Sequence, residues 1–418
     1  MPEKVIAVAL ILPQIPRSTV EEHLAELGQL ISTAGGEVVA QVFAKRTAPD
    51  SATYVGKGKA EEIHSLVEHH AATLVVFDDD LSPAQLRNVQ KIVGERAKVI
   101  DRSALILDIF AGRAKTREAR TQVELAQLEY MLPRLTRAWT HLERQAGGIG
   151  TRGVGETQLE LDRRIVRTRV ARLKEELIKI EKTRETQRSR RQHDAFTVAL
   201  VGYTNAGKST LFNRLTVGGA EAMDKLFATL DSRSQKAAFE MPRETVIVDT
   251  VGFIRKLPHH LVASFRSTME EAVAADLVLH VIDVSHPQYT EQRAIGDEVL
   301  TDLGVDSARV LDVYNKADRL DEDFEIRRKD AATVSALTGQ GIDVLVERIR
   351  ERERAGGELL QLAIPHQQSR FVAKLHEVAE VQEQRVTDDA ILFTAWVPKD
   401  SVHLFQPFVT RESARLAG

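Results

Sequence analysis

The 418-residue sequence predicts an α/β multidomain protein, and three observations support this prediction. Strand-like apolar runs alternate with helical patterns over the first hundred residues, which indicates a small parallel α/β domain. Two apolar seams with heptad spacing follow and indicate an antiparallel helical hairpin. A strand, a glycine-rich phosphate-loop motif and a helix come next, so a doubly wound parallel sheet is expected there.

Four domains follow from these patterns. We expect an N-terminal α/β domain at 1–107, a helical hairpin at 108–192, a P-loop domain with a Ras-like doubly wound sheet at 193–355, and a small α+β C-terminal domain at 356–418. The last domain shows strand-like and helical runs in alternation but no chemistry that its residues identify.

The composition excludes several classes of protein. There is no cysteine, so neither disulfides nor thiolate metal sites can occur. No signal peptide is visible and no apolar run is long enough to cross a bilayer, so we expect a soluble, cytoplasmic protein. The net charge of −4 argues against a globally basic nucleic-acid binder, although it allows a local basic face. No surface demands a dimer, and a monomer is expected.

The first domain should contain four strands and three helices. We expect strands at 5–12, 37–44, 73–77 and 98–101, and helices at 20–31, 60–70 and 83–93, the last opened by Ser82 and Pro83. Gly56-Lys57-Gly58-Lys59 could contact RNA phosphate or form a structural turn, and its spacing does not match a second nucleotide site. The aspartates at 78–80 are interpreted as a solvated strand end rather than a metal site.

The helical hairpin is predicted from two series of apolar residues. They step by three and four residues, as in a heptad seam with a kink at Pro133. The first series is Leu125, Leu128, Leu132, Leu135, Trp139 and Leu142, and the second is Val166, Val170, Leu173, Leu177 and Ile180.

A glycine-rich loop at 147–157 joins the two helices. Its five glycines in nine residues cost backbone entropy and permit close approach to another molecule. Arginines surround the loop, which suits insertion into a phosphate-lined cavity through backbone and shape contacts. The alternative is a disordered loop on a solvated coiled coil of mixed charge.

The stretch Gly202-Tyr203-Thr204-Asn205-Ala206-Gly207-Lys208-Ser209 follows an apolar strand at 196–201 and leads into a helix. This is the G-x-x-x-x-G-K-S pattern in the context that turns it into a phosphate site. Lys208 would reach the β- and γ-phosphates, and the Ser209 hydroxyl would bind Mg²⁺. The expected nucleotide contacts here are Gly202, Asn205, Ala206, Gly207, Lys208, Ser209 and Thr210.

Three further motifs end apolar runs downstream, and together they predict a GTP site. Asp249-Thr250-Val251-Gly252 would place a carboxylate near Mg²⁺ and the Gly252 N–H near the γ-phosphate. In Asn315-Lys316-Ala317-Asp318, the Asp318 carboxylate can accept two hydrogen bonds from guanine but none from N1 of adenine. The backbone of Ser335, Ala336 and Leu337 could meet guanine O6.

The catalytic assignment lacks one group. Phe253 holds the place where Ras-like enzymes carry a glutamine that orients water, so hydrolysis should be slow without a partner. Thr216 and Thr229 are the candidate threonines of the first switch. For Thr229, the role of a Mg²⁺ ligand is favoured over that of an ordinary loop threonine. The expected catalytic residues are Lys208, Thr229 and Gly252, and the expected metal ligands are Ser209, Thr229 and Asp249.

The tip sequence at 147–160 (GGIGTRGVGETQLE) resembles the HflX family of ribosome-associated GTPases. The resemblance extends to 55–59, 227–231 and 249–253 and covers the chain in domain order, with Val154 in place of the usual proline. It implies GTP/GDP and Mg²⁺ as ligands and the 50S subunit and 70S ribosome as partners, with the tip near 23S rRNA. Residues implied to contact RNA are Arg144, Gly150, Arg152 and Arg163.

The resemblance implies a factor that splits stalled or hibernating 70S ribosomes under stress. GTP would order the switches and so favour large-subunit binding, and hydrolysis would release the protein. Two alternatives stay open. One is a signalling switch whose GTP state recruits a protein effector through the C-terminal domain, and the other is an RNA remodeller driven by nucleotide.

Overall fold

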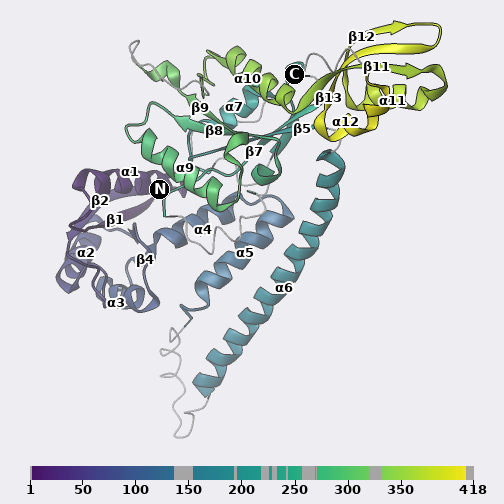
Figure 1. Ribbon diagram of the computed structural model, residues 1–418. Coiled ribbons are helices and arrows are strands. Elements are labelled where there is room, and N and C mark those ends of the chain that lie inside the picture. Colours follow the sequence, from purple (N-terminus) through teal and green to yellow (C-terminus); the bar gives the residue numbers. More distant parts are fainter. Residues whose placement is uncertain are drawn as a thin grey trace. The chain divides into compact units, whose positions relative to one another are not determined.

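The structure is a computed structural model that describes residues 2–135, 154–192, 195–217, 226–227, 233–241, 243–256, 269, 271–320 and 331–410. The chain separates into two compact units (Figure 1). The first comprises Met1–Thr183, Met223–Asp231 and Ile254–Ser267, and the second comprises Arg184–Ala222, Ser232–Phe253 and Thr268–Gly418. Each unit is described by itself.

The first unit begins with a parallel sheet of strand order β2-β1-β3-β4. Its strands are β1 (Glu3–Ile11), β2 (Gly36–Lys45), β3 (Leu74–Phe77) and β4 (Lys98–Asp101), and its helices are α1 (Arg17–Thr33), α2 (Lys57–His70) and α3 (Pro83–Val93). All seven elements lie where the sequence predicts them. The Ser82 side chain accepts from the Gln85 N–H and Gln85 returns the bond, so α3 opens with a capping box.

Helix α4 (Arg102–Arg113) runs across the domain boundary predicted at residue 107. The reason is that Asp101, the last residue of β4, caps α4 by accepting from the Ala104 N–H. Five apolar α4 side chains that include Leu105, Ile106 and Phe110 are buried, which makes the helix part of the domain core rather than of the hairpin.

The hairpin is antiparallel, as expected. Helices α5 (Arg117–Met131) and α6 (Val154–Gln192) are joined by three ion pairs, and from the first of them to the second the residue number rises on α5 and falls on α6. These pairs are Arg117–Glu176, Arg169–Glu124 and Lys174–Glu129. The seam residue Leu173 is 1% exposed. Because α6 already begins at Val154, the last residues of the loop expected at 147–157 are helical.

The second unit contains a six-stranded sheet of order β10-β9-β8-β5-β7-β6, with β6 antiparallel to β7 and the other pairs parallel. Its strands are β5 (Phe196–Gly202), β6 (Arg233–Lys236), β7 (Thr245–Asp249), β8 (Leu277–Asp283), β9 (Val310–Asn315) and β10 (Ala331–Thr333). The helices are α7 (Lys208–Leu215), α9 (Tyr289–Asp302) and α10 (Ile342–Ala355), with short 3₁₀ turns at Ser307–Arg309 and Ala317–Arg319. Each predicted motif therefore follows a strand of one sheet.

The C-terminal part of this unit is an antiparallel sheet of order β11-β13-β12. It comprises β11 (Gly357–Pro365), β12 (Glu380–Val386) and β13 (Ala390–Pro398) with α11 (Ser369–Val378), α12 (Lys399–Phe405) and 3₁₀ turns at His366–Gln368 and Gln406–Phe408. The Trp396 indole N–H donates to the Arg354 carbonyl at 3.0 Å and so ties the sheet to α10.

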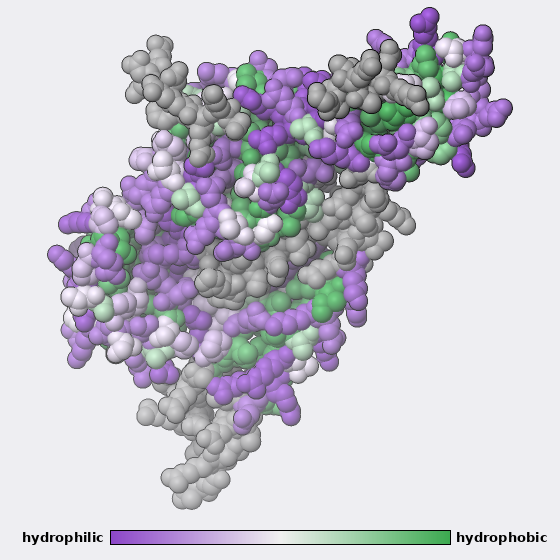
Figure 2. Space-filling view, viewed as in Figure 1, coloured by the Kyte–Doolittle hydropathy of each residue, from purple (hydrophilic) through white to green (hydrophobic). Residues whose placement is uncertain are grey.

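Two short segments lie within the range predicted as one domain, 193–355. Residues 223–231 and 254–267 cluster with the N-terminal unit rather than with the sheet around them in sequence. Within the described part of the chain, no helix is long and apolar enough to span a bilayer. Figure 2 shows a mostly hydrophilic surface with hydrophobic areas over the C-terminal sheet and along α5–α6.

Candidate functional site

The phosphate loop is built by a sharp change of direction after β5. Gly202 has a φ of +144°, Asn205 +61° and Gly207 +92°, so three residues within six take conformations that favour glycine or asparagine. A Cβ on Gly202 would run into the carbonyl of Val281 on β8. The backbone therefore wraps tightly and delivers Lys208 as the first residue of α7.

The Lys208 side chain is buried and held by carbonyl groups of its own loop. Its ammonium donates to the carbonyl oxygens of Gly202 at 3.0 Å and Tyr203 at 2.8 Å. Burial lowers the pKa of Lys208 to about 8, against a smaller raising effect of Asp249. Neutral carbonyls compensate a buried ammonium poorly, so this group favours an anionic ligand.

Ser209 and Asp249 come together at the end of β7. The Ser209 hydroxyl donates to Asp249 Oδ2 at 2.9 Å, and Asp249 is 1% exposed. A hydroxyl and a carboxylate oxygen at this spacing fit the ligand set of a small hard cation such as Mg²⁺. Thr216 does not join them, because it is buried and its hydroxyl donates to the Phe212 carbonyl at 2.7 Å.

The D-x-x-G glycine lies against the phosphate loop. A Cβ on Gly252 would stand 2.8 Å from the Lys208 ammonium and 2.9 Å from the backbone of Thr204. The neighbouring Phe253 exchanges backbone hydrogen bonds with the loop, accepting from Thr204 N–H and donating to the Gly202 carbonyl. Its ring is 3% exposed and packs in the apolar core, so it does not orient water.

The third motif reaches both sides of the site. The Asn315 amide donates to the Ala206 carbonyl at 2.8 Å, and its oxygen accepts from the Ala336 N–H at 2.9 Å. Asp318 accepts from the Ser335 hydroxyl at 2.5 Å, which fixes one carboxylate oxygen. The four predicted motifs are thus brought together by contacts among their own residues.

Two residues that sequence reasoning missed also shape this end of the site. Arg214, near the end of α7, donates to the carbonyls of Ala336 at 3.2 Å and Leu337 at 2.6 Å. Asp283, the last residue of β8, pairs with Lys316 at 2.6 Å. A polar residue ending an apolar strand run was the available signal for Asp283, whereas nothing near Arg214 in sequence indicates its partners.

Some predicted residues are not placed. Thr229, Arg144, Gly150 and Arg152 lie outside the described residues. Thr210 follows Ser209 in the first turn of α7, and Arg163 lies on α6 in the other unit.

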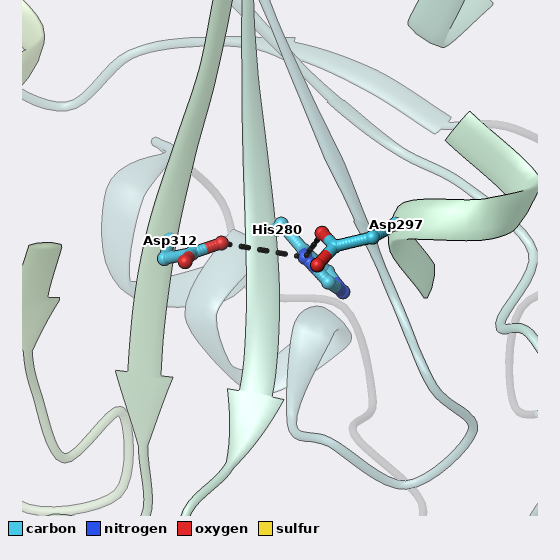
Figure 3. Close-up of side chains that lie close together, drawn as sticks. All are labelled: His280, Asp297 and Asp312. Carbon is cyan, nitrogen blue, oxygen red and sulfur yellow. Dashed lines mark ion pairs between the residues drawn. The ribbon is translucent and has the colours of Figure 1, made fainter. Parts of the chain in front are cut away.

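A second charged cluster lies beside the sheet (Figure 3), where His280 of β8 faces Asp312 of β9 and Asp297 of α9. Its Nδ1 is 3.4 Å from Asp312 and 3.5 Å from Asp297. Burial lowers the pKa of His280, but the two carboxylates raise it by more, so the net pKa is raised. Arg293 also pairs with both aspartates, at 3.0 Å from Asp312 and 3.4 Å from Asp297, so its guanidinium takes up carboxylate oxygens that a metal ion would need.

Comparison with known proteins identifies the chain. A family model described as GTP-binding GTPase N-terminal matches residues 21–111, one for the GTP-binding GTPase middle region matches 113–191, and one for 50S ribosome-binding GTPase matches 197–316. The chain is 45% identical to GTPase HflX of Magnetococcus marinus, over 93% of this chain and 91% of that one. It is 45% identical to GTPase HflX of Escherichia coli over 88% of both chains, and 38% identical to that of Chlamydia pneumoniae over 98% and 89%. With four GTPase motifs assembled at one edge of a sheet, the chain belongs to the GTPase HflX family, a family of ribosome-binding GTPases, and hydrolyses GTP.

Proposed function

We propose that this GTPase binds the large ribosomal subunit and splits stalled or hibernating 70S ribosomes under stress, as a cytoplasmic monomer. The nucleotide site would drive the cycle, and the rod formed by α5 and α6 would carry the contact with 23S rRNA. The observation that carries the nucleotide half is the contact of Asn315 with both the phosphate loop and the Ala336 amide.

In the proposed site, Gly202, Asn205, Ala206, Gly207, Ser209 and Thr210 surround the phosphates. Lys208 would exchange its two carbonyl partners for the β- and γ-phosphates, a charge-assisted contact that a buried ammonium favours. The Gly252 N–H is assigned to the γ-phosphate, since a Cβ there would meet the Lys208 ammonium.

Ser209, Thr229 and Asp249 would hold Mg²⁺. The ion would neutralise charge that develops on the phosphates, and the protein's part is to fix the oxygen ligands. Since Thr216 bonds to Phe212, Thr229 is the remaining candidate for the threonine ligand.

Guanine would be selected at the other end of the site. Asp318 accepts from the Ser335 hydroxyl with one oxygen and would accept from the base with its carboxylate, while Asn315 and Lys316 would line the base site. Of the amides at 335–337, Ser335 N–H donates to Gln340 and Ala336 N–H to Asn315, so Leu337 N–H is the one that donates to no residue within the described ranges. We therefore assign guanine O6 chiefly to Leu337, which Arg214 holds by its carbonyl.

The ribosome half rests on the charge pattern of α6. Arg169 and Lys174 form ion pairs with Glu124 and Glu129 of α5, respectively. Arg163, Arg164 and Arg167, nearer the start of α6, pair with no carboxylate that the structure describes, and Arg164 and Arg167 are exposed. Arginines of this kind are suited to phosphate contacts, and they flank the loop that holds Arg144, Gly150 and Arg152.

The test compares exposed arginines with a paired one. GTP turnover is measured with and without 50S and 70S particles, and splitting is followed by light scattering. We expect ribosomes to accelerate turnover by several orders of magnitude, in the range that partners supply to GTPases. Arg152→Ala and the double variant Arg164→Ala/Arg167→Ala should lose most of this stimulation, whereas Arg169→Ala should keep it.

Lys208→Ala should abolish both turnover and splitting. Ribosome-independent turnover that is equal in all variants would contradict the proposal and favour a switch that recruits a protein effector. Splitting by Lys208→Ala at the wild-type rate would contradict the requirement for GTP.

A further inference from the structure

Phe227 and Lys256 belong to the first unit, although each comes from a segment that follows a motif of the nucleotide site in sequence, the phosphate loop for Phe227 and D-x-x-G for Lys256. Phe227 belongs to the segment 223–231 and Lys256 to the segment 254–267, and both segments cluster with the N-terminal α/β domain. Leu226, Phe227, Ile254 and Arg255 are all less than a tenth exposed, although they lie outside the helices and strands.

Lys256 is held by two carboxylates at the end of β3. Its ammonium lies 2.6 Å from Asp78 Oδ2 and 2.5 Å from Asp79 Oδ1. Asp78 is 1% exposed and also accepts from the buried Arg102 at 2.6 Å, while Arg102 pairs with Glu26 of α1. Arg102 thus pairs with Asp78 and Glu26 of its own domain, and Lys256 supplies a second cation to Asp78 and pairs with Asp79 as well.

This arrangement replaces the solvated strand end expected for residues 78–80. The sequence could not show it, because Lys256 lies 178 residues from Asp78. The neighbouring His23 of α1 responds to the same cations: burial first, and then Lys256 and Arg255, lower its pKa. The cations of the 254–267 segment therefore face α1 as well as β3.

Phe227 is held by an aromatic contact. Its ring lies 4.6 Å from that of Phe110 of α4, at an interplanar angle of 82°, and both rings are 2% exposed or less. Edge-to-face pairs of this geometry add stabilisation beyond the burial of apolar surface. Like Lys256, Phe227 is fastened to the core of the N-terminal domain.

Both residues have strained backbones. Phe227 has a φ of +55° and Lys256 a φ of +52°, in the left-handed region that bulky L-residues rarely adopt. Such conformations persist where the surrounding contacts over-determine them, and they cluster at switch regions. The same departure in two separate segments, each with its side chain in the N-terminal domain, marks the two contacts as built anchors.

The anchors lie close in sequence to Thr229, which is assigned to Mg²⁺, and to Gly252, which is assigned to the γ-phosphate. Phe227 is two residues before Thr229, and Lys256 is four residues after Gly252. Since an extended chain spans about 3.4 Å per residue, the Cα atom of Gly252 lies no more than about 14 Å from that of Lys256. Restricting a segment before a ligand orders it lowers the entropy cost of binding.

We propose that Phe227 and Lys256 are positioning residues of the GTPase, which fasten both switch segments to the N-terminal domain and so favour GTP over GDP. The inference rests on the roles proposed above for Thr229 and Gly252. Since coupling is reciprocal, bound GTP would in turn stabilise the contacts of Phe227 and Lys256. GTP binding would thereby affect the unit that carries the rod.

The test measures affinities of the full chain for GDP and for a non-hydrolysable GTP analogue by nucleotide fluorescence. We expect Lys256→Ala and Phe227→Ala each to lower the preference for the analogue over GDP about tenfold, within the usual range of coupling between sites. Affinity for GDP should stay within about twofold. Lys256→Arg should restore the preference, because the cation is kept.

Asp79→Asn removes one partner of Lys256 without touching Arg102, so it should lower the preference even if Phe227→Ala folds poorly. Lys59→Ala is the matched control, because Lys59 pairs with Glu62 of the same domain at 2.7 Å but lies far from either switch in sequence. Thermal unfolding of each variant without nucleotide separates loss of fold from loss of coupling.

The inference is wrong if Lys256→Ala and Asp79→Asn keep the wild-type preference, or raise it. Gly252→Ala tests the underlying assignment, because it should lose the analogue whatever the anchors do. If Gly252→Ala kept its preference for the analogue, the proposed nucleotide roles themselves would fail. If it lost that preference while the anchor variants did not, only the anchors would be refuted.

Discussion

Lys208 of the phosphate loop and Lys256 of the segment after D-x-x-G have opposite electrostatic surroundings. Lys208 is buried against two neutral carbonyls, and burial lowers its pKa to about 8. Burial also lowers the pKa of Lys256, but Asp78 and Asp79 raise it by more, so the net pKa is raised. Within the described part of the chain, Lys208 has no carboxylate partner at short range, so its charge is available to a ligand. Lys256 has two carboxylate partners, so its charge stabilises the fold.

The largest effect on stability should come from removing a carboxylate partner of Lys256. Asp78→Asn removes a carboxylate that serves both Lys256 and the buried Arg102. We expect the free energy of unfolding to fall by about 3 kcal/mol or more, because a buried charge loses its partner. Urea denaturation checks this, and a loss below about 1 kcal/mol would show that Glu26 and Asp79 suffice.

Removing the ligand-binding lysine should leave the fold intact. Lys208→Ala should weaken binding of a non-hydrolysable GTP analogue by about 100-fold or more, since two charge-assisted hydrogen bonds at about 1.5 kcal/mol each are lost. Without nucleotide, its unfolding free energy should match wild type within about 1 kcal/mol. A variant that unfolds easily yet binds the analogue normally would reverse the two roles.

The lowered pKa predicts a pH dependence of binding. Phosphates bind the protonated ammonium of Lys208, and this group loses its proton above about pH 8 in the free protein. Affinity for GDP should therefore be level below pH 8 and fall by about tenfold for each further unit. Titration of Lys208→Ala, which retains the ionisation of guanine, gives the baseline to subtract, and identical curves would refute the assignment.

The smallest effect belongs to an exposed pair. Lys59 and Glu62 lie 2.7 Å apart on α2, with side chains 28% and 52% exposed. Lys59→Ala should change the unfolding free energy by no more than about 0.5 kcal/mol. A loss as large as that of Asp78→Asn would mean that burial does not explain the contrast.

Most of the fold could be predicted from the sequence because its signals are local. Apolar runs, the Ser82–Gln85 cap and the four motifs each lie within a few neighbouring residues. Asp249, Gly252 and Asn315 reach the phosphate loop because the carboxyl ends of parallel strands meet at one edge.

What could not be predicted depends on contacts between distant residues. The helix that runs across the predicted end of the first domain was not foreseen, because α4 is capped by Asp101 and buried with the core, and no composition change marks this. The role of residues 78–80 depends on Lys256, far along the chain. Nothing in the sequence announces that Arg214 holds the Ala336 and Leu337 carbonyls either.

Asn315 also has a consequence for how the protein ages. Its amide uses both ends, donating to the Ala206 carbonyl and accepting from the Ala336 amide. Deamidation, a thermal lesion of asparagine, would replace the donor with a carboxylate oxygen facing that carbonyl. One such event would turn an attraction between the two halves of the pocket into a repulsion. Stored protein should therefore lose nucleotide binding as this residue deamidates, with its overall fold still intact. The deamidation is detected as a mass increase of about one dalton at Asn315.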